Sequence, residues 1–125
     1  MPNREAFPAV FSRLKATLEP YTPHLLVTED EPASYMLYAL ASTKYPKGLM
    51  FGGVQIKKNY VSHHPMPVYA FPDLLDGLSE PLRQRMQGKS CFNFTAITAI
   101  DDGPMAELEA LTARGFERYR RGGVA

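Results

Sequence analysis

The sequence has very little cysteine and no long apolar run. Its single cysteine, Cys91, excludes an intrachain disulfide and the cysteine-rich zinc and CxxC redox motifs, and it favours a reducing compartment. No stretch contains the roughly eighteen consecutive apolar residues of a membrane-spanning helix. The first eight residues, Met-Pro-Asn-Arg-Glu-Ala-Phe-Pro, lack the apolar core of a signal peptide. We therefore expect a cytoplasmic protein with no membrane partner.

An excess of either charge is also lacking. Fourteen Lys and Arg residues oppose thirteen Asp and Glu residues, which leaves a formal net charge of +1. This balance argues against a nucleic-acid binder, because such a protein needs a broad basic surface. The locally basic stretch near the C-terminus has the composition that is common at the end of a helix; it holds Arg114, Arg118, Arg120 and Arg121. We expect no nucleic-acid partner.

The composition that remains is that of one folded domain. Apolar residues make up 45% of the chain and charged residues 22%, which is close to the average of soluble proteins and argues against disorder. A chain of 125 residues can bury one sizeable core, and no repeat or linker divides it. We therefore expect a single domain over residues 1–125.

Helical signals mark both ends of the chain. Apolar residues spaced as on one face of a helix predict a helix over 4–19; they are Phe7, Val10, Phe11, Leu14 and Leu18. Near the other end, Asp101 or Asp102 is expected to cap a last helix. Two shorter helical pieces are expected at 72–75 and at 79–86.

The details of the second short helix depend on single residues. Ser79 is the expected N-cap, and Gly88 is the expected stop. Segment 66–72, which holds several prolines, is expected to be irregular and extended.

The middle of the chain has the patterns of strands. Alternating or β-branched apolar residues predict five strands, at about 25–27, 35–40, 49–57, 60–63 and 91–97. An acidic turn at 29–32 would join the first two, and Gly52 and Gly53 predict a bulge or a close backbone approach. The order predicts an α+β fold: an antiparallel sheet of about five strands, with N- and C-terminal helices on one face and a short helical excursion before the last strand.

Residues 87–94 place a cation, a hydroxyl and the cysteine where a loop turns into an apolar run. Gly88-Lys89-Ser90 resembles the end of a phosphate-binding P-loop, but that motif needs a glycine where this chain has Arg83. The P-loop is therefore excluded. An anion site formed by Lys89, Ser90 and loop amides stays open, beside a plain helix end followed by a strand.

Cys91 and two adjacent histidines, His63 and His64, are the candidates for catalysis. A histidine as base and Lys89 as a stabilising cation would make Cys91 a nucleophile, whereas its phenylalanine neighbours favour a small buried apolar role. Adjacent residues in a strand point to opposite faces, so the two histidines cannot readily bind one metal ion, and His24 is isolated. We expect no metal and no cofactor, and we assign no catalytic residue.

Aromatic residues are frequent in the predicted strands and their flanks; they include Tyr35, Tyr38, Phe51, Tyr60, Tyr69 and Phe71. Tyrosines at the mouth of a pocket would suit a small planar or anionic ligand. Tyrosine is also common in half-buried strands, so packing is favoured for most of them.

Five short motifs stand out as a set: Phe51-Gly52-Gly53-Val54, the segment 57–64, Pro67-Val68-Tyr69, Pro72-Asp73-Leu74-Leu75 and Gly88-Lys89-Ser90-Cys91-Phe92-Asn93-Phe94. Together they resemble the YdhG-like superfamily of small bacterial domains of unknown function, over nearly the whole chain. The resemblance implies an antiparallel α+β domain akin to frataxin-like and secretion-chaperone-like architectures, and it implies no activity. Some members carry an iron-chaperone label, which would need a carboxylate-rich ridge. The first predicted helix departs from this, since its only acids are Glu5 and Glu19.

The leading hypothesis is a non-enzymatic domain that binds a small anionic ligand or a peptide where the strand at 60–64 meets the loop at 89–91. The expected contact residues are Lys57, Tyr60, His64, Tyr69, Lys89 and Ser90. Three alternatives stay open. They are a small enzyme that uses Cys91 with His63 or His64, a frataxin-like iron-binding chaperone, and an interaction module that pairs with a protein partner or forms a homodimer.

Overall fold

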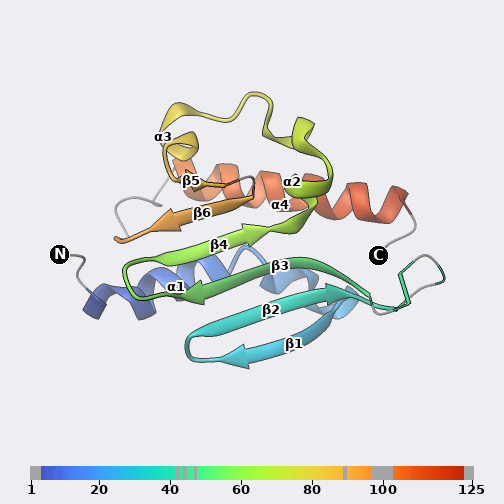
Figure 1. Ribbon diagram of the computed structural model, residues 1–125, viewed down its shortest axis with the longest axis horizontal. Coiled ribbons are helices and arrows are strands. Elements are labelled where there is room, and N and C mark those ends of the chain that lie inside the picture. Colours follow the sequence, from blue (N-terminus) through green and yellow to red (C-terminus); the bar gives the residue numbers. More distant parts are fainter. Residues whose placement is uncertain are drawn as a thin grey trace.

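The computed structural model describes residues 4–41, 43, 45–46, 48–88, 90–96 and 103–122. Within them, one antiparallel sheet has the strand order β1-β2-β3-β4-β6-β5 (Figure 1). Its strands are β1 (Leu26–Glu31), β2 (Ser34–Ala39), β3 (Leu49–Ile56), β4 (Val61–Pro65), β5 (Met86–Gln87) and β6 (Cys91–Phe94). The predicted α+β class is confirmed, and the sheet has six strands where about five were expected.

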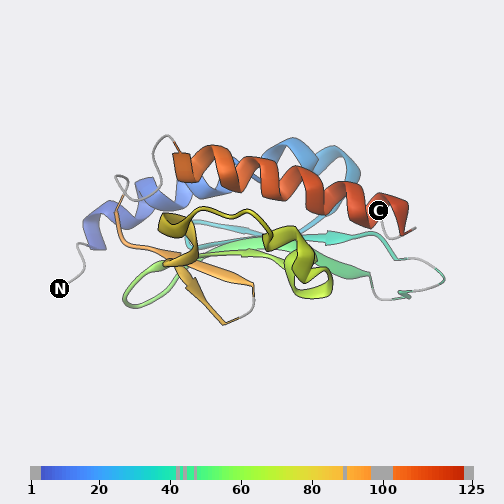
Figure 2. The same cartoon turned by 90° about the horizontal axis from the view of Figure 1, so that it is seen from above.

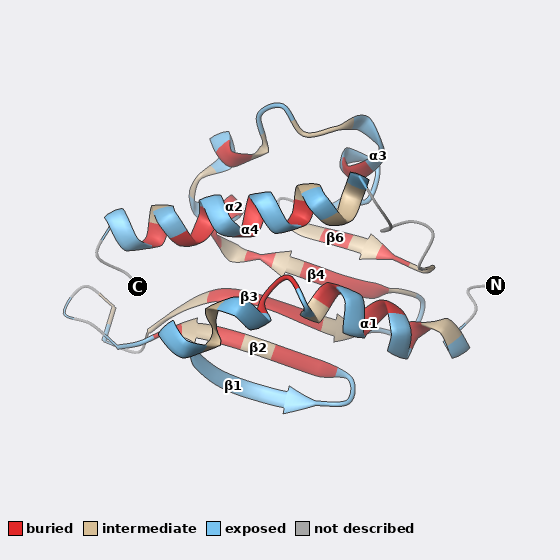
Figure 3. Cartoon of the chain, turned by 180° about the vertical axis from the view of Figure 1, so that it is seen from behind, coloured by how far each residue is buried: buried red, intermediate tan, exposed pale blue. Residues whose placement is uncertain are grey.

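Two longer helices, α1 (Phe7–Lys15) and α4 (Gly103–Arg121), lie together on one face of the sheet, as Figure 2 and Figure 3 show. The remaining helical segments are η1 (Arg4–Ala6) before α1, η2 (Glu19–His24) after it, and α2 (Met66–Ala70), η3 (Pro72–Leu75) and α3 (Glu80–Arg83) between β4 and β5. The N- and C-terminal helices therefore share one face, as predicted. The expected cap of the last helix, Asp101 or Asp102, lies outside the described residues. We call the sheet face turned away from α1 and α4 the open face.

The hydrophobic core lies between the sheet and these two helices. Alternation along β2 buries Tyr35, Leu37 and Ala39 and leaves Met36 and Tyr38 half-buried on the open face. The predicted apolar stripe of α1 is buried as well: Phe7, Val10, Phe11 and Leu14. Each such side chain contributes about 1.5–3 kcal/mol when it is removed from water. Because the core uses one face of the sheet, the side chains of the open face are left for other contacts.

The glycine pair in β3 lies at the irregularity that the sequence predicted. The register of β2 and β3 shifts where Leu37 pairs with Gly52 and Tyr38 pairs with Met50, so Phe51 is the extra residue of a β-bulge.

The first helix is shorter than predicted. α1 ends at Lys15 instead of residue 19, and a turn at 16–18 leads into η2. In that turn the Thr17 hydroxyl donates a 2.7 Å hydrogen bond to the Leu14 carbonyl. A hydroxyl that bonds a backbone carbonyl in this way competes with regular helix formation.

The prediction of an acidic turn at 29–32 was wrong for its three acids. Glu29–Glu31 belongs to β1, and the turn is formed by Pro32 and Ala33. β1 is an edge strand whose six residues are all exposed. Charged side chains lower the stability of such an exposed strand little. The second half of β1 therefore lacks the alternation of apolar and polar residues by which a strand is predicted from sequence.

The segment after β4 is helical, so the prediction of an extended 66–72 was wrong. α2 places Pro67 in its first turn, where a missing amide hydrogen is tolerated. The helix buries Pro67 and Val68, and this tertiary packing explains why a proline-rich segment folds into a helix.

The helix predicted at 79–86 was wrong in its second half. α3 ends at Arg83, and Met86 instead pairs with Phe92 of β6. Gly88 does not stop a helix: its φ of +77° places it in the turn between β5 and β6. Glycine adopts this left-handed conformation without the steric cost that a side chain adds.

Candidate functional site

The open face carries a row of polar side chains that the strand register aligns. Gln55 of β3 pairs with Ser62 of β4, and Ser62 pairs with Asn93 of β6. In the neighbouring row Gly53 pairs with His64. Residues two apart in a strand share a face, so both rows belong to one surface.

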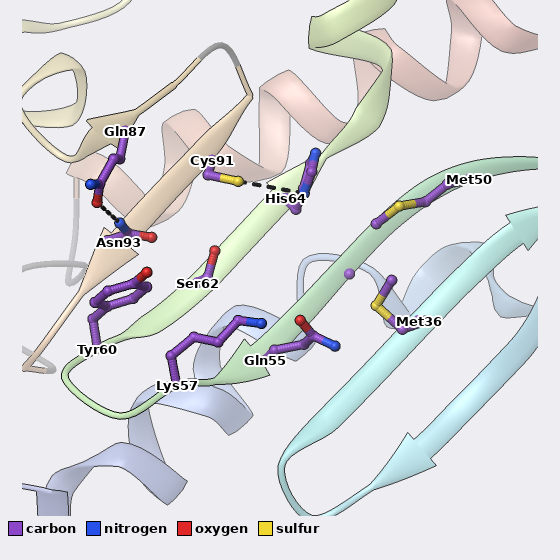
Figure 4. A pocket seen from close by; sticks show the side chains of 11 residues that line it. Met36, Met50, Gln55, Lys57, Tyr60, Ser62, His64, Gln87, Cys91 and Asn93 are labelled. Carbon is purple, nitrogen blue, oxygen red and sulfur yellow. Dashed lines mark hydrogen bonds between the residues drawn. The ribbon is translucent and has the colours of Figure 1, made fainter.

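A hollow of about 280 Å³ lies over these rows (Figure 4). The described residues that line it are Met36, Met50, Gly53, Gln55, Lys57, Tyr60, Ser62, His64, Gln87, Cys91 and Asn93. Three of the predicted contact residues, Lys57, Tyr60 and His64, are therefore brought together, and the candidate nucleophile Cys91 lies with them.

The turn between β3 and β4 places Lys57 and Tyr60 at the rim of the hollow. The Lys57 amide donates a 2.8 Å hydrogen bond to the Tyr60 carbonyl, which fixes the two residues relative to each other. Lys57 is the one lysine or arginine, and no aspartate or glutamate is present, among the described residues of the lining. The hollow therefore favours negative charge.

Asn93 contributes an acceptor without a partner. Its side-chain nitrogen donates a 2.7 Å hydrogen bond to Oε1 of Gln87, while its Oδ1 is buried and accepts no hydrogen bond within the described part of the chain. A buried polar atom without a partner costs about 1–3 kcal/mol.

Cys91, His64 and Ser90 form a chain of contacts at one end of the hollow. The Nδ1 atom of His64 lies 3.4 Å from the Cys91 Sγ atom, and its Nε2 atom lies 2.7 Å from the Ser90 Oγ atom. Desolvation lowers the pKa of His64 from its ordinary value, so its imidazole is neutral at pH 7. With Nε2–H donating to Ser90, the free electron pair of Nδ1 faces the thiol and can accept its proton.

His63 points to the opposite face and takes no part in this chain of contacts. Its Nε2 atom lies 2.8 Å from the Thr17 hydroxyl oxygen, and that hydroxyl already donates to the Leu14 carbonyl. His63 must therefore donate from Nε2, which leaves its buried Nδ1 unprotonated and without a hydrogen-bond partner within the described residues. Burial, and to a lesser degree the charge of His64, lower the pKa of His63 to about 3.

The other three predicted contact residues, Ser90, Tyr69 and Lys89, are not among the described residues that line the hollow. Ser90 is buried and reaches the site through His64. Tyr69 is 59% exposed and borders a separate hollow near Pro72 and Met86. Lys89 lies outside the described residues.

Six residues that line the hollow were not among the contact residues predicted from the sequence: Met36, Met50, Gln55, Ser62, Gln87 and Asn93. The available signal was parity, since Ser62 shares a strand face with His64, and Asn93 shares one with Cys91. Using that signal requires the register that joins β4 to β6, which no local pattern gives.

The residues that the structure describes also bear on metal binding and on membrane insertion. No group of three His, Cys, Asp or Glu side chains is placed to hold a metal ion there. Within the same residues, no helix has the length and apolar character that are needed to cross a bilayer.

No protein-family model, curated protein or solved structure matches this chain. The resemblance to the YdhG-like superfamily therefore stays a prediction.

Proposed function

We propose that this domain binds a small organic anion with a short apolar portion in the hollow on the open face. The observation that carries the proposal is the charge of the lining: Lys57 stands there without an aspartate or glutamate among the described lining residues. A ligand carboxylate would gain a cationic partner at the rim and would meet no aspartate or glutamate among the described residues of the lining.

The other lining groups suit the rest of such a ligand. Gln55 Nε2 donates to the Ser34 hydroxyl and Gln87 Oε1 accepts from Asn93, so the Gln87 Nε2 group is the side-chain amide donor best placed to bind a ligand carboxylate. Met36 and Met50 add flexible, polarizable apolar contacts. This mixture fits a short carbon chain with polar ends.

The size of the hollow favours a small molecule over a large cofactor. Ligand pockets commonly span about 300–1,000 Å³, and this hollow of about 280 Å³ lies at the lower end. The proposal agrees with the resemblance to the YdhG-like superfamily, which implies no activity. It also agrees with a reducing cytoplasm, where Cys91 stays a free thiol.

The test is a titration of the ¹⁵N-labelled protein with suberate, a straight-chain dicarboxylate, followed by NMR. We expect shifts of the backbone amides around Lys57, His64 and Cys91, with a dissociation constant on the order of millimolar for so small a ligand. The uncharged 1,8-octanediol should bind more weakly, because it lacks the carboxylates.

Two variants and a matched control sharpen this test. Lys57→Gln should weaken suberate binding about two- to fivefold, which is the range of one partly exposed ion pair. Lys58→Gln removes the same charge one residue away, on a side chain outside the lining, and should leave binding unchanged. In Gly53→Ala the new methyl group meets the Met36 thioether, so the hollow becomes smaller and binding is lost. Equal effects of Lys57→Gln and Lys58→Gln would contradict the proposal.

A further inference from the structure

We propose that the hollow is a site of thiol–disulfide exchange, in which a small carboxylate-bearing disulfide forms a mixed disulfide with Cys91 and His64 accepts the thiol proton. This inference rests on the proposed function, because the same hollow must first hold the anionic disulfide. It adds a covalent step and names the chemical class of the ligand.

The contacts of His64 are those that the proton transfer needs. The 3.4 Å separation of its Nδ1 atom from the Cys91 Sγ atom is a sulfur hydrogen-bond distance. The 2.7 Å contact of Nε2 with the Ser90 Oγ atom holds the ring in this orientation. Ser90 is buried and does not line the hollow, so it acts as a positioning residue. Cys91 itself is only half-buried and lines the hollow.

The step balances without any further reactant. His64 Nδ1 takes the proton of Cys91, and the thiolate attacks one sulfur of the bound disulfide. A bond forms between Cys91 Sγ and that sulfur, while the original sulfur–sulfur bond breaks. The departing thiolate takes the proton from His64 and leaves as a free thiol. The cysteine is oxidised to a mixed disulfide, and the released half of the ligand is reduced.

The lining of the hollow suits a disulfide. Acyl transfer needs donors aimed at a developing oxyanion, whereas exchange spreads its charge over three sulfur atoms and places no oxyanion in the site. The thioethers of Met36 and Met50 supply a polarizable wall of the same hollow. Lys57 then selects a disulfide that carries carboxylates.

The chain also determines how the reaction ends. Cys91 is its single cysteine, so no second thiol of the same chain can displace the bound half of the ligand. The mixed disulfide therefore persists until an external thiol reduces it. Cys91 would thus carry this reversible modification only while the disulfide is supplied faster than external thiols reduce the adduct.

Two disulfides of equal chain length and opposite charge provide the test, and each rate is divided by the rate of the same disulfide with free N-acetylcysteine because their leaving thiols differ in pKa. The reduced protein is mixed with 3,3′-dithiodipropionate or with cystamine at pH 7, and the mass increase at Cys91 is followed over time. We expect dithiodipropionate to react at least about threefold faster, and we expect Lys57→Gln to remove this preference while Lys58→Gln retains it. Equal rates for the two disulfides in the unmodified protein would overturn the proposal.

The role of His64 is tested by two replacements of similar shape. His64→Gln and His64→Asn keep an amide near the positions of Nε2 and Nδ1, respectively, but neither accepts a proton at neutral pH. Each should lower the exchange rate at pH 7 by about tenfold or more, with the amide NMR spectrum reporting that the fold is retained. An unchanged rate in a folded variant would overturn the role of His64.

Suberate, the all-carbon analogue of dithiodipropionate, separates this inference from the proposed function. Suberate binding without any adduct on Cys91 would leave the binding function standing and overturn the exchange. Charge-selective formation of the adduct without measurable suberate binding would leave the exchange standing and overturn the stable binding function.

Discussion

His63 and His64 are neighbours in the sequence, and alternation along β4 gives them opposite surroundings. The sequence predicted that they point to opposite faces. It could not predict which of them faces Cys91, because that depends on the pairing of His63 with Phe92 across two strands that are 26 residues or more apart. The amides of the site were missed for the same reason. Gln55 and Asn93 are ordinary strand residues until the register aligns them.

The surroundings of His63 predict how stability depends on pH. Its pKa is about 3 in the folded protein and about 6.5 when the chain is unfolded. Between these values the unfolded state binds a proton that the folded state does not bind, so the free energy of unfolding falls as the pH falls. Above pH 6.5 this residue contributes no pH dependence. We expect His63 alone to cost up to about 2 kcal/mol between pH 6.5 and pH 5, measured by urea unfolding.

Replacing the imidazole identifies its share of that loss. His63→Leu removes the titrating group. The free energy of unfolding should then fall less between pH 7 and pH 5, by up to about 2 kcal/mol, which is the contribution of the one proton that His63 binds on unfolding. His64, whose pKa is also lowered by burial, keeps a smaller contribution in the variant. If the original protein and His63→Leu lost equal stability, His63 would have to be protonated in the folded state.

At the scale of elements, the predictions succeeded where one side of an element is buried. They failed where contacts with distant parts of the chain determine whether a segment becomes a helix or a strand. The periodicity of α1 and the alternation of β2 follow from burial against one core. In contrast, α2 forms because it packs against α4, and β5 forms because Met86 and Gln87 pair with residues of β6. A short segment whose partner lies far along the chain carries no reliable local pattern.

The contact between α2 and α4 depends on a glycine in the middle of α4. A Cβ atom at Gly115 would lie 2.9 Å from the Cβ and 3.0 Å from the Cγ of Pro67. Alanine improves helix propensity by about 1 kcal/mol, but the proline ring is rigid and α2 would have to move. We expect Gly115→Ala to lower the free energy of unfolding by about 1–2 kcal/mol, measured by urea unfolding.

A second glycine of α4 serves as the matched control. Gly103 begins the helix, and a Cβ atom there would meet nothing within 4 Å. Gly103→Ala should change the free energy of unfolding by less than about 0.5 kcal/mol. Stabilisation by Gly115→Ala would mean that α2 is not held tightly against α4.

For the whole molecule, the arrangement of one sheet with helices on one face separates stability from binding. Helices α1 and α4 cover one face of the sheet (Figure 2), where the core lies, while the hollow lies on the open face (Figure 4). The sequence predicted this layered arrangement, because amphipathic end helices and alternating strands require a shared apolar interface. Substitutions in the hollow should therefore alter binding with little effect on folding.

The same arrangement leaves β1 as an exposed edge, whose unpaired backbone groups could bind another strand. Its apolar residues Leu26 and Val27 are 52% and 38% exposed, and the acids Glu29–Glu31 follow them. Acidic side chains on an edge oppose pairing with a second copy, because like charges would face each other. We expect the double variant Asp30→Thr/Glu31→Thr to self-associate, seen by light scattering as a mass that rises with concentration.

The control for this prediction removes two negative charges away from the sheet. Asp76→Thr/Glu80→Thr changes two exposed acids, one directly after η3 and one at the first residue of α3, so it alters the net charge equally and leaves the β1 edge intact. We expect this variant to keep the mass of the original protein across the dilution series. Equal association of both double variants would show that net charge, and not the edge, limits self-association. If the original protein were a dimer and the β1 substitutions made it a monomer, the acids would be stabilising contacts with a second copy. The β1 edge would then be a native interface.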